Sequence, residues 1–154
     1  MKGYKVFNSD WTCRGFQYEA GKTYEMNKMP VICECGFHFC TDPKNCFRYY
    51  DFWGDIKIAE IEALGDIDME YTGGKYCTNK IKIIRELSLK DAKIEIETIK
   101  ENATLFFLFI NNNSCLYPPL ACPVKLEKDT FVSPRGVSYV KLEVIKSITF
   151  SEEE

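Results

Sequence analysis

The sequence predicts an α+β fold, a single domain of mixed or antiparallel β-strands with one short early helix. Much of the chain consists of short segments in which apolar and polar residues alternate, which is the period of a half-buried strand. A clear helix start occurs at Asp42-Pro43. The length of 154 residues and a hydrophobic content of 45% suit one buried core, and no internal repeat or linker divides the chain.

The first forty residues are predicted to form strands. The segment "GYKVFN", residues 3–8, alternates as a strand does. The segment "FQYEAGKTYEM", residues 16–26, alternates on both sides of residues 20–22, which predicts a hairpin with its turn there. Residues 30–40 favour two short extended pieces that are broken at Gly36, because glycine permits a sharp bend.

A helix is predicted to follow Asp42. An aspartate accepts hydrogen bonds from the first free N–H groups of a helix, and Pro43 suits the first helical position because no N–H is needed there. Gly54 is expected to end this helix. The expected apolar stripe consists of Cys46, Phe47 and Tyr50.

The rest of the chain is predicted to be mostly strands. Residues 104–111 lack alternation, which predicts a strand buried on both faces. Three prolines indicate a long loop over residues 111–123, and residues 151–154 form an acidic tail. The alternating segments that predict the remaining strands are "DIKIAEIEALG" (55–65), "NKIKIIREL" (79–87), "DAKIEIETIKEN" (91–102) and "GVSYVKLEVIKSITF" (136–150), and a turn is expected at 72–74.

Charge and hydropathy exclude two classes of partner. The net charge is −3 and basic residues alternate with acidic ones, so we expect no preference for nucleic acid, which needs a basic face. The most apolar run, Leu105 to Ile110, is far shorter than the roughly 20 residues of a membrane span. No export signal follows Met1, so we expect a cytoplasmic protein without a membrane partner.

The cysteines are interpreted chiefly as reduced core residues. The chain has eight cysteines, and a cytoplasmic protein keeps thiols reduced. Disulfides and a zinc site remain alternatives. The zinc alternative would use Cys33, Cys35, Cys40 and Cys46, although their spacing departs from the paired pattern of structural zinc sites.

Two residue types suggest candidates for catalysis. His38 is the only histidine, so any Cys-His or Ser-His mechanism has to use it. Glu60 falls on the same strand face as Ile56 and Ile58, which makes it a candidate acid in a pocket. A structural role for the histidine and a rim position for the glutamate are the alternatives.

Several motifs resemble a domain of uncharacterised function that is widespread in phages and prophages and often precedes pentapeptide-like repeats. They are "KGYKVFNSDWTCRGFQYEAGKTYE", "CECGFHFCTDPKNCFRYY" and "KIAEIEALGDI". The resemblance covers residues 1–100, whereas residues 101–154, with the long loop and the last strands, depart from it. It implies a small phage or prophage accessory protein in a bacterial host cell.

A second resemblance is to the ADP-ribosyltransferase fold. It rests on Gly36-Phe37-His38-Phe39, on the helix start at Asp42-Pro43 and on Tyr49. The resemblance implies that His38 and Tyr49 frame a nicotinamide, with Tyr4 and Lys5 on the first strand of the same NAD cleft. The catalytic glutamate of active transferases corresponds to Ser138 here, and Glu143 comes too late, so the family's charge-stabilising group is missing.

Three functions therefore remain open. The favoured hypothesis is an accessory protein without a resident cofactor that binds a host or competitor protein, for example to inhibit a bacterial defence system. The second is an ADP-ribosyltransferase-like enzyme or NAD-binding protein, with His38, Tyr49 and Glu60 as catalytic candidates. The third is a zinc-binding module. A preserved fold does not imply preserved activity, which favours binding over catalysis.

Overall fold

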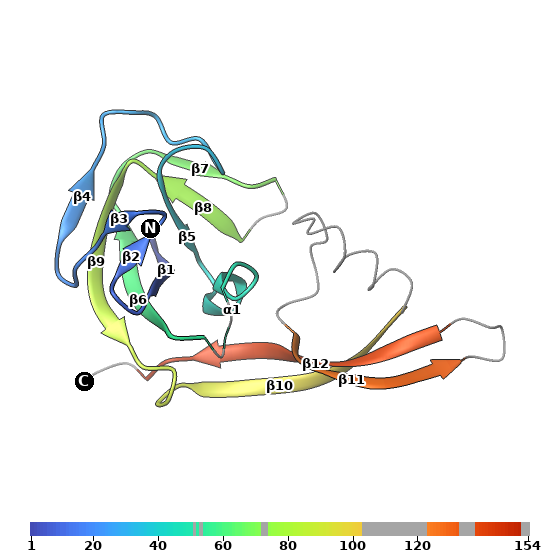
Figure 1. Ribbon diagram of the computed structural model, residues 1–154. Helices are drawn as coiled ribbons and strands as arrows, with labels where there is room; N and C mark the ends of the chain where they lie inside the picture. Colours follow the sequence, from blue (N-terminus) through green and yellow to red (C-terminus); the bar gives the residue numbers. More distant parts are fainter. Residues whose placement is uncertain (51, 53, 72–73, 103–122, 133–137, 152–154) are drawn as a thin grey trace. The chain divides into compact units, whose positions relative to one another are not determined.

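The computed structural model describes residues 1–50, 52, 54–71, 74–102, 123–132 and 138–151 (Figure 1). The chain divides into two compact units, and each is considered by itself. The first consists of residues 1–92 with 149–154, and the second of residues 93–148. Within the described ranges, no helix has the length and apolar character that would carry it across a membrane.

The first unit contains one short helix and nine of the strands. The bounds are β1 Lys2–Asn8, β2 Thr12–Cys13, β3 Phe16–Gln17, β4 Thr23–Glu25, β5 Phe37–Cys40, α1 Pro43–Cys46, β6 Ile56–Ala63, β7 Ile67–Met69, β8 Lys75–Thr78 and β9 Lys80–Leu87. Seven of these strands form one sheet in the order β4-β9-β6-β1-β5-β8-β7, which curves strongly (Figure 1). The strands β2 and β3 form a separate small hairpin.

The second unit is a three-stranded sheet. Its strands are β10 Lys93–Asn102, β11 Pro123–Val132 and β12 Ser138–Thr149, in the order β10-β12-β11. β11 and β12 pair as antiparallel strands. Each strand pairing whose register is described in either unit is antiparallel, so a β-rich fold with antiparallel strands and one short helix is confirmed for the described residues.

Strand β1 lies at the centre of the seven-stranded sheet. It pairs with β6 along its whole length, from Lys2↔Glu62 to Asn8↔Ile56. Its pairing with β5 is much shorter and is centred on Tyr4↔Cys40. Gly3 allows this close approach, since a Cβ there would lie 2.7 Å from the Cys40 carbonyl oxygen. Beyond this junction the two strands are no longer paired.

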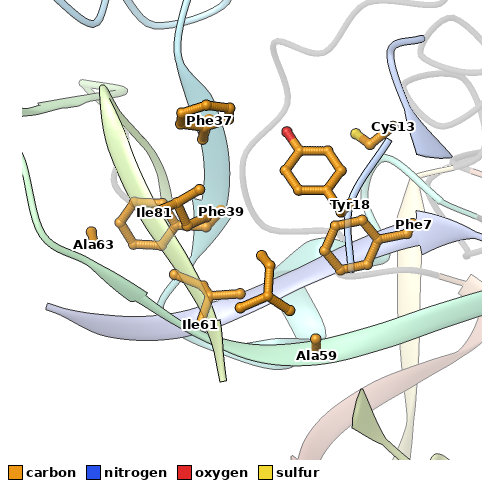
Figure 2. Close-up of a cluster of buried hydrophobic side chains, with 10 residues drawn as sticks. Phe7, Cys13, Tyr18, Phe37, Phe39, Ala59, Ile61, Ala63 and Ile81 are labelled. Atoms are coloured by element: carbon orange, nitrogen blue, oxygen red, sulfur yellow. The ribbon is translucent and has the colours of Figure 1, made fainter. Parts of the chain in front are cut away.

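The core of the first unit lies on one face of this sheet (Figure 2). The isoleucines of β6 and β9 that face it, Ile61, Ile81 and Ile83, are fully buried. Phe7 is also fully buried, and its ring centroid lies 5.1 Å from that of Tyr18 and 5.2 Å from that of Trp11. The aromatic rings therefore connect the sheet to the segment that carries β2 and β3.

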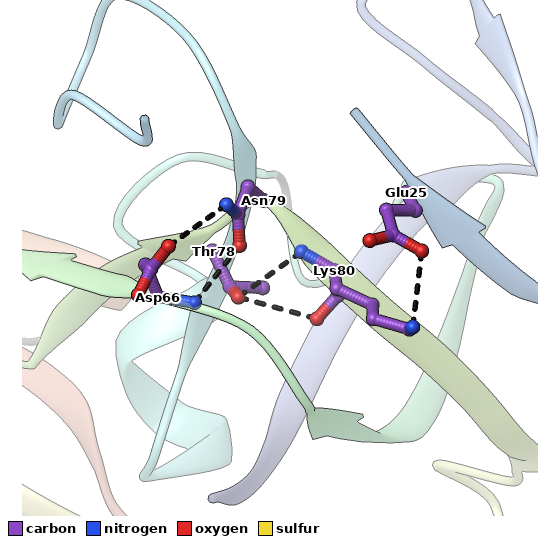
Figure 3. Close-up of polar contacts among 5 residues, drawn as sticks. All are labelled: Glu25, Asp66, Thr78, Asn79 and Lys80. Carbon is purple, nitrogen blue, oxygen red and sulfur yellow. Dashed lines mark hydrogen bonds and ion pairs between the residues drawn. The ribbon is translucent and has the colours of Figure 1, made fainter. Parts of the chain in front are cut away.

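A polar cluster fixes the turn between β8 and β9 (Figure 3). The Asn79 side chain accepts from the Asp66 N–H at 2.8 Å and donates to the Asp66 carboxylate at 3.1 Å. Lys80 forms an ion pair with Glu25 of β4 at 3.0 Å. These contacts hold the start of β7 and the strand β4 against the same turn. β7 and β8 were not predicted from the sequence, because their few residues lack a long alternating pattern.

Three local predictions were wrong. Residues 31–35 form a tight turn closed by a bridge between Val31 and Cys35, not an extended piece. No hairpin joins β3 to β4, because β3 pairs with β2 and β4 pairs with β9 instead. The helix α1 ends at Cys46 rather than at Gly54. The N–H groups of Arg48 and Tyr49 bond to carbonyls three residues back, so the chain continues in turns tighter than an α-helix. The predicted strand at 104–111 and most of the loop at 111–123 lie outside the described residues.

Candidate functional site

A cavity of about 570 Å³ opens in the first unit where β1 and β5 cease to pair. Its lining comes from β1, β5 and the β2–β3 hairpin, and from segments around α1 and β8. The lining residues that carry the chemistry are Tyr4, Lys5, Cys13, Arg14, Phe16, Tyr18, Glu34, Phe37, His38, Cys40, Cys46, Tyr49, Tyr50 and Lys75. Four of the sequence-predicted site residues, Tyr4, Lys5, His38 and Tyr49, thus meet at one cavity.

Lys5 lies at the floor of the cavity and is only 5% exposed. Its Nζ donates to the His38 carbonyl oxygen at 2.8 Å, a bond across the opening that β1 and β5 leave. It also contacts the Cys13 Sγ at 3.5 Å and lies within 5.5 Å of the ring centroids of Phe7 and Tyr18. Burial lowers the pKa of Lys5.

His38 holds the turn that precedes β5. Its Nε2 accepts a hydrogen bond from the Cys33 N–H at 2.9 Å, so the neutral ring carries its proton on Nδ1. Cys33 has a φ of 66°, a left-handed conformation that residues other than glycine adopt rarely. Burial, followed by the charges of Lys5, Lys75 and other cations, lowers the pKa of His38 to about 4. The imidazole is therefore neutral at physiological pH.

Tyr49 and Lys75 lie at the rim of the cavity. The Tyr49 side chain is 38% exposed, and the Lys75 Nζ lies 4.5 Å from the centroid of its ring. The same Nζ contacts the Cys33 Sγ at 3.2 Å, which ties the rim to the turn that His38 holds. Tyr4 is partly exposed on β1, and its ring stacks on Phe150 with centroids 5.9 Å apart.

Residues 1–95 match a family described as a domain of unknown function, DUF7666. The chain belongs to the DUF7666 family. Every residue that lines the cavity falls within the matched DUF7666 region. This confirms an uncharacterised domain over most of the stretch for which the phage-type resemblance was noted. No curated protein and no solved structure matches the chain, so no structural neighbour supports the resemblance to ADP-ribosyltransferases.

Glu60 lies in the DUF7666 region but does not line the cavity. Its carboxylate pairs with Arg85 at 3.0 Å and with Lys2 at 3.4 Å. The hydrogen bond from Arg85 is the main reason that the pKa of Glu60 is lowered. The structure therefore does not bring Glu60 together with His38 and Tyr49.

The four cysteines of the zinc alternative take different positions. Cys33 and Cys35 lie on the turn before β5, where the Cys35 thiol donates to the Met29 carbonyl oxygen at 3.2 Å. Cys40 and Cys46 are buried, and a hydrogen bond with Cys46 lowers the pKa of Cys40. Within the part of the chain that the structure describes, no three Cys, His, Asp or Glu side chains are grouped as a metal site would need.

Sequence reasoning missed the contribution of the β2–β3 hairpin to the DUF7666 cavity. Arg14 and Gly15 have φ values of 52° and 75°, and this two-residue turn with two positive φ angles joins Cys13 to Phe16. The hairpin brings Cys13, Arg14 and Phe16 to the cavity. The pair Arg14-Gly15 is a signal for such a hairpin turn. The segment around it shows no alternation, so the sequence predicts only a turn-rich connection there.

Proposed function

We propose that the chain binds a small planar anion of the nucleotide class in the cavity between β1 and β5. The observation that carries the proposal is the composition of the lining, in which aromatic rings occur together with an excess of positive charge. Cavities of a few hundred Å³ with apolar walls and few polar groups are typical of small-molecule sites.

Aromatic side chains form part of the cavity wall. Phe16 and Phe37 are near one another, with ring centroids 5.7 Å apart, and Tyr18 lies 4.7 Å from Phe16. Tyr49 adds a further ring at the rim. Such rings favour a ligand with a planar aromatic part, because stacking adds to the gain from burial.

The charges that line the cavity favour an anion. Lys5, Arg14 and Lys75 are the cationic residues of the lining, and Glu34 is its one carboxylate among the described residues. Three positive charges against one negative charge attract a phosphate or a carboxylate to the opening. The chain as a whole has a net charge of −3, so this excess is local.

NAD belongs to this ligand class and is therefore a candidate ligand. Binding is favoured over ADP-ribosyl transfer, because Glu60 lies away from the cavity and is engaged by Arg85. The neutral His38 bonds to the Cys33 N–H, which supports a role in shaping the turn rather than in proton transfer.

Calorimetric titration tests the proposal. We expect AMP and NAD to bind and uncharged adenosine to bind more weakly, with added salt reducing the difference. The Tyr49→Ala variant should weaken binding by about 2- to 10-fold, the range expected for one aromatic contact. Tyr71→Ala is the matched control, because Tyr71 is fully exposed and does not line the cavity. The absence of heat with both anions at millimolar concentration would refute the proposal.

A protein partner is the second candidate function. The supporting observation is β7, the edge strand of the seven-stranded sheet, on which Ile67 and Met69 are exposed at alternate positions, followed by Tyr71. A partner strand could add to this edge. The partner predicted from the phage-type resemblance is a host or competitor protein, with inhibition of a defence system as one outcome. Loss of a captured protein in a Met69→Lys variant, compared with Lys90→Glu, would test the edge as the binding site.

A further inference from the structure

We propose that Lys5 forms a reversible imine with the aldehyde group of a ligand held in the cavity. The inference deepens the proposed function and rests on the cavity being a small-molecule site. It names a covalent anchor and a second ligand class, namely planar aromatic aldehydes that carry an anionic group. Three observations support the inference: the position of the Lys5 amine, the groups that surround it and the thiol beside it, which can act as an acid.

The first support is the position of the amine. Lys5 is 5% exposed yet belongs to the cavity lining, so its Nζ is removed from bulk solvent and still borders the space in which a ligand would lie. The bond of 2.8 Å to the His38 carbonyl oxygen fixes its location. No carboxylate of the described residues forms an ion pair with it. A surface lysine, by contrast, moves freely and is strongly hydrated.

The second support is the set of groups around the amine. Burial disfavours the ammonium form, so a larger fraction of Lys5 than of an exposed lysine is the neutral amine that attacks a carbonyl carbon. The thiols of Cys13, Cys46 and Cys40 raise the pKa of Lys5 and so oppose the effect of burial. The positive charge of Lys5 lowers the pKa of His38. The titratable groups around Lys5 are Cys13 on β2, Tyr18 after β3, His38 and Cys40 on β5, Cys46 on α1 and Tyr50 after it.

The third support is an acid beside the amine. The Cys13 Sγ lies 3.5 Å from the Lys5 Nζ and 3.0 Å from the Tyr50 hydroxyl oxygen. Imine formation begins when the Nζ lone pair attacks the carbonyl carbon, and a proton passes from nitrogen to the oxygen. The resulting hydroxyl group leaves as water after it takes a proton from the Cys13 thiol. The N–H proton that remains on the iminium nitrogen either stays there, with Cys13 as the thiolate, or passes to that thiolate and restores the thiol. The net change is one C=N bond and one water molecule.

The rings near the amine suit a planar aldehyde. The Lys5 Nζ lies 5.5 Å from the Phe7 ring centroid and 5.4 Å from that of Tyr18, so the new C=N bond would form beside an aromatic cluster of which Tyr18 lines the cavity. Arg14 and Lys75 border the same cavity and could neutralise an anionic group on the far side of the ligand. The same lining thus serves a nucleotide-like anion and an aromatic aldehyde.

The test is reductive trapping on the full chain. The protein is incubated at pH 7 with a substoichiometric amount of pyridoxal 5′-phosphate, an aromatic aldehyde with a phosphate group. Cyanoborohydride then delivers hydride to the imine carbon, and peptide mass spectrometry locates the label. A lowered lysine pKa raises the fraction of neutral amine at pH 7, so we expect Lys5 to carry more label than any exposed lysine.

Matched variants complete the test. Lys57→Arg should leave the labelling of Lys5 unchanged, since Lys57 also lies over a ring, that of Trp11, but pairs with Glu86 and does not line the cavity. Lys5→Arg should abolish the dominant label while it keeps a cation at the site. Should that variant fail to fold, protection of wild-type Lys5 by excess AMP provides the same comparison.

The outcomes separate this inference from the proposed function. Label that spreads over exposed lysines and spares Lys5 would overturn the imine, even if AMP and NAD bind. A dominant label on Lys5 in a chain that gives no heat with either nucleotide would support the imine and refute the nucleotide class. A dominant label that excess AMP suppresses would support both.

Discussion

Truncation of Phe7 to alanine is expected to lower the free energy of unfolding by about 3–5 kcal/mol. Phe7 is fully buried, and its ring contacts Trp11 and Tyr18 with centroids about 5 Å apart (Figure 2). Removal of the ring forfeits its transfer free energy and leaves a void among rigid neighbours. Because Tyr18 also lines the candidate cavity, the same change should weaken ligand binding.

Urea unfolding followed by tryptophan fluorescence measures this effect, since Trp11 lies beside the altered site. Tyr71→Ala is the control for loss of an aromatic ring, and we expect it to change stability by less than about 0.5 kcal/mol because Tyr71 is fully exposed. A Phe7→Ala variant as stable as the control would mean that the aromatic cluster does not hold the hairpin of β2 and β3 on the sheet.

The strands that could be predicted from the sequence are those with sustained alternation. β1, β6, β9, β10 and β12 all lie in segments where apolar and polar residues alternate over at least part of the strand. The turn at residues 20–22 was also located correctly, but its pairing was not. The Gly21 N–H bonds to the Ile83 carbonyl oxygen, so a distant strand competes with the local hairpin. Alternation specifies which residues share a face, whereas pairing partners depend on the whole sheet.

The candidate site could be predicted in part. The resemblance to the ADP-ribosyltransferase fold implies that four residues share a cleft, namely Tyr4, Lys5, His38 and Tyr49. All four line one cavity in the structure. What these residues do could not be predicted from residue type. The direction of an imidazole or a carboxylate depends on its neighbours, and those of Glu60 are Arg85 of β9 and Lys2 of β1.

The stability of the first unit is expected to fall between pH 7 and pH 5 in a way that depends on His38. Its pKa is lowered to about 4 in the folded chain, mainly by burial, and it is about 6.5 when the side chain is fully solvated. Between these values the unfolded chain binds a proton that the folded chain does not. The stabilisation is therefore complete above about pH 7 and is lost as the pH falls toward 4.

The imidazole is partly exposed, and solvent screening reduces the effect to roughly 1–2 kcal/mol over this range. The His38→Gln variant is the control, because an amide oxygen can accept the bond from the Cys33 N–H but does not titrate. Urea midpoints at pH 7 and pH 5 should therefore differ more for the wild type than for His38→Gln, with carboxylate titration common to both. Parallel pH profiles would show that the pKa of His38 in the folded chain is not lowered from its solvated value, which would contradict the buried position of the imidazole as acceptor of the Cys33 N–H.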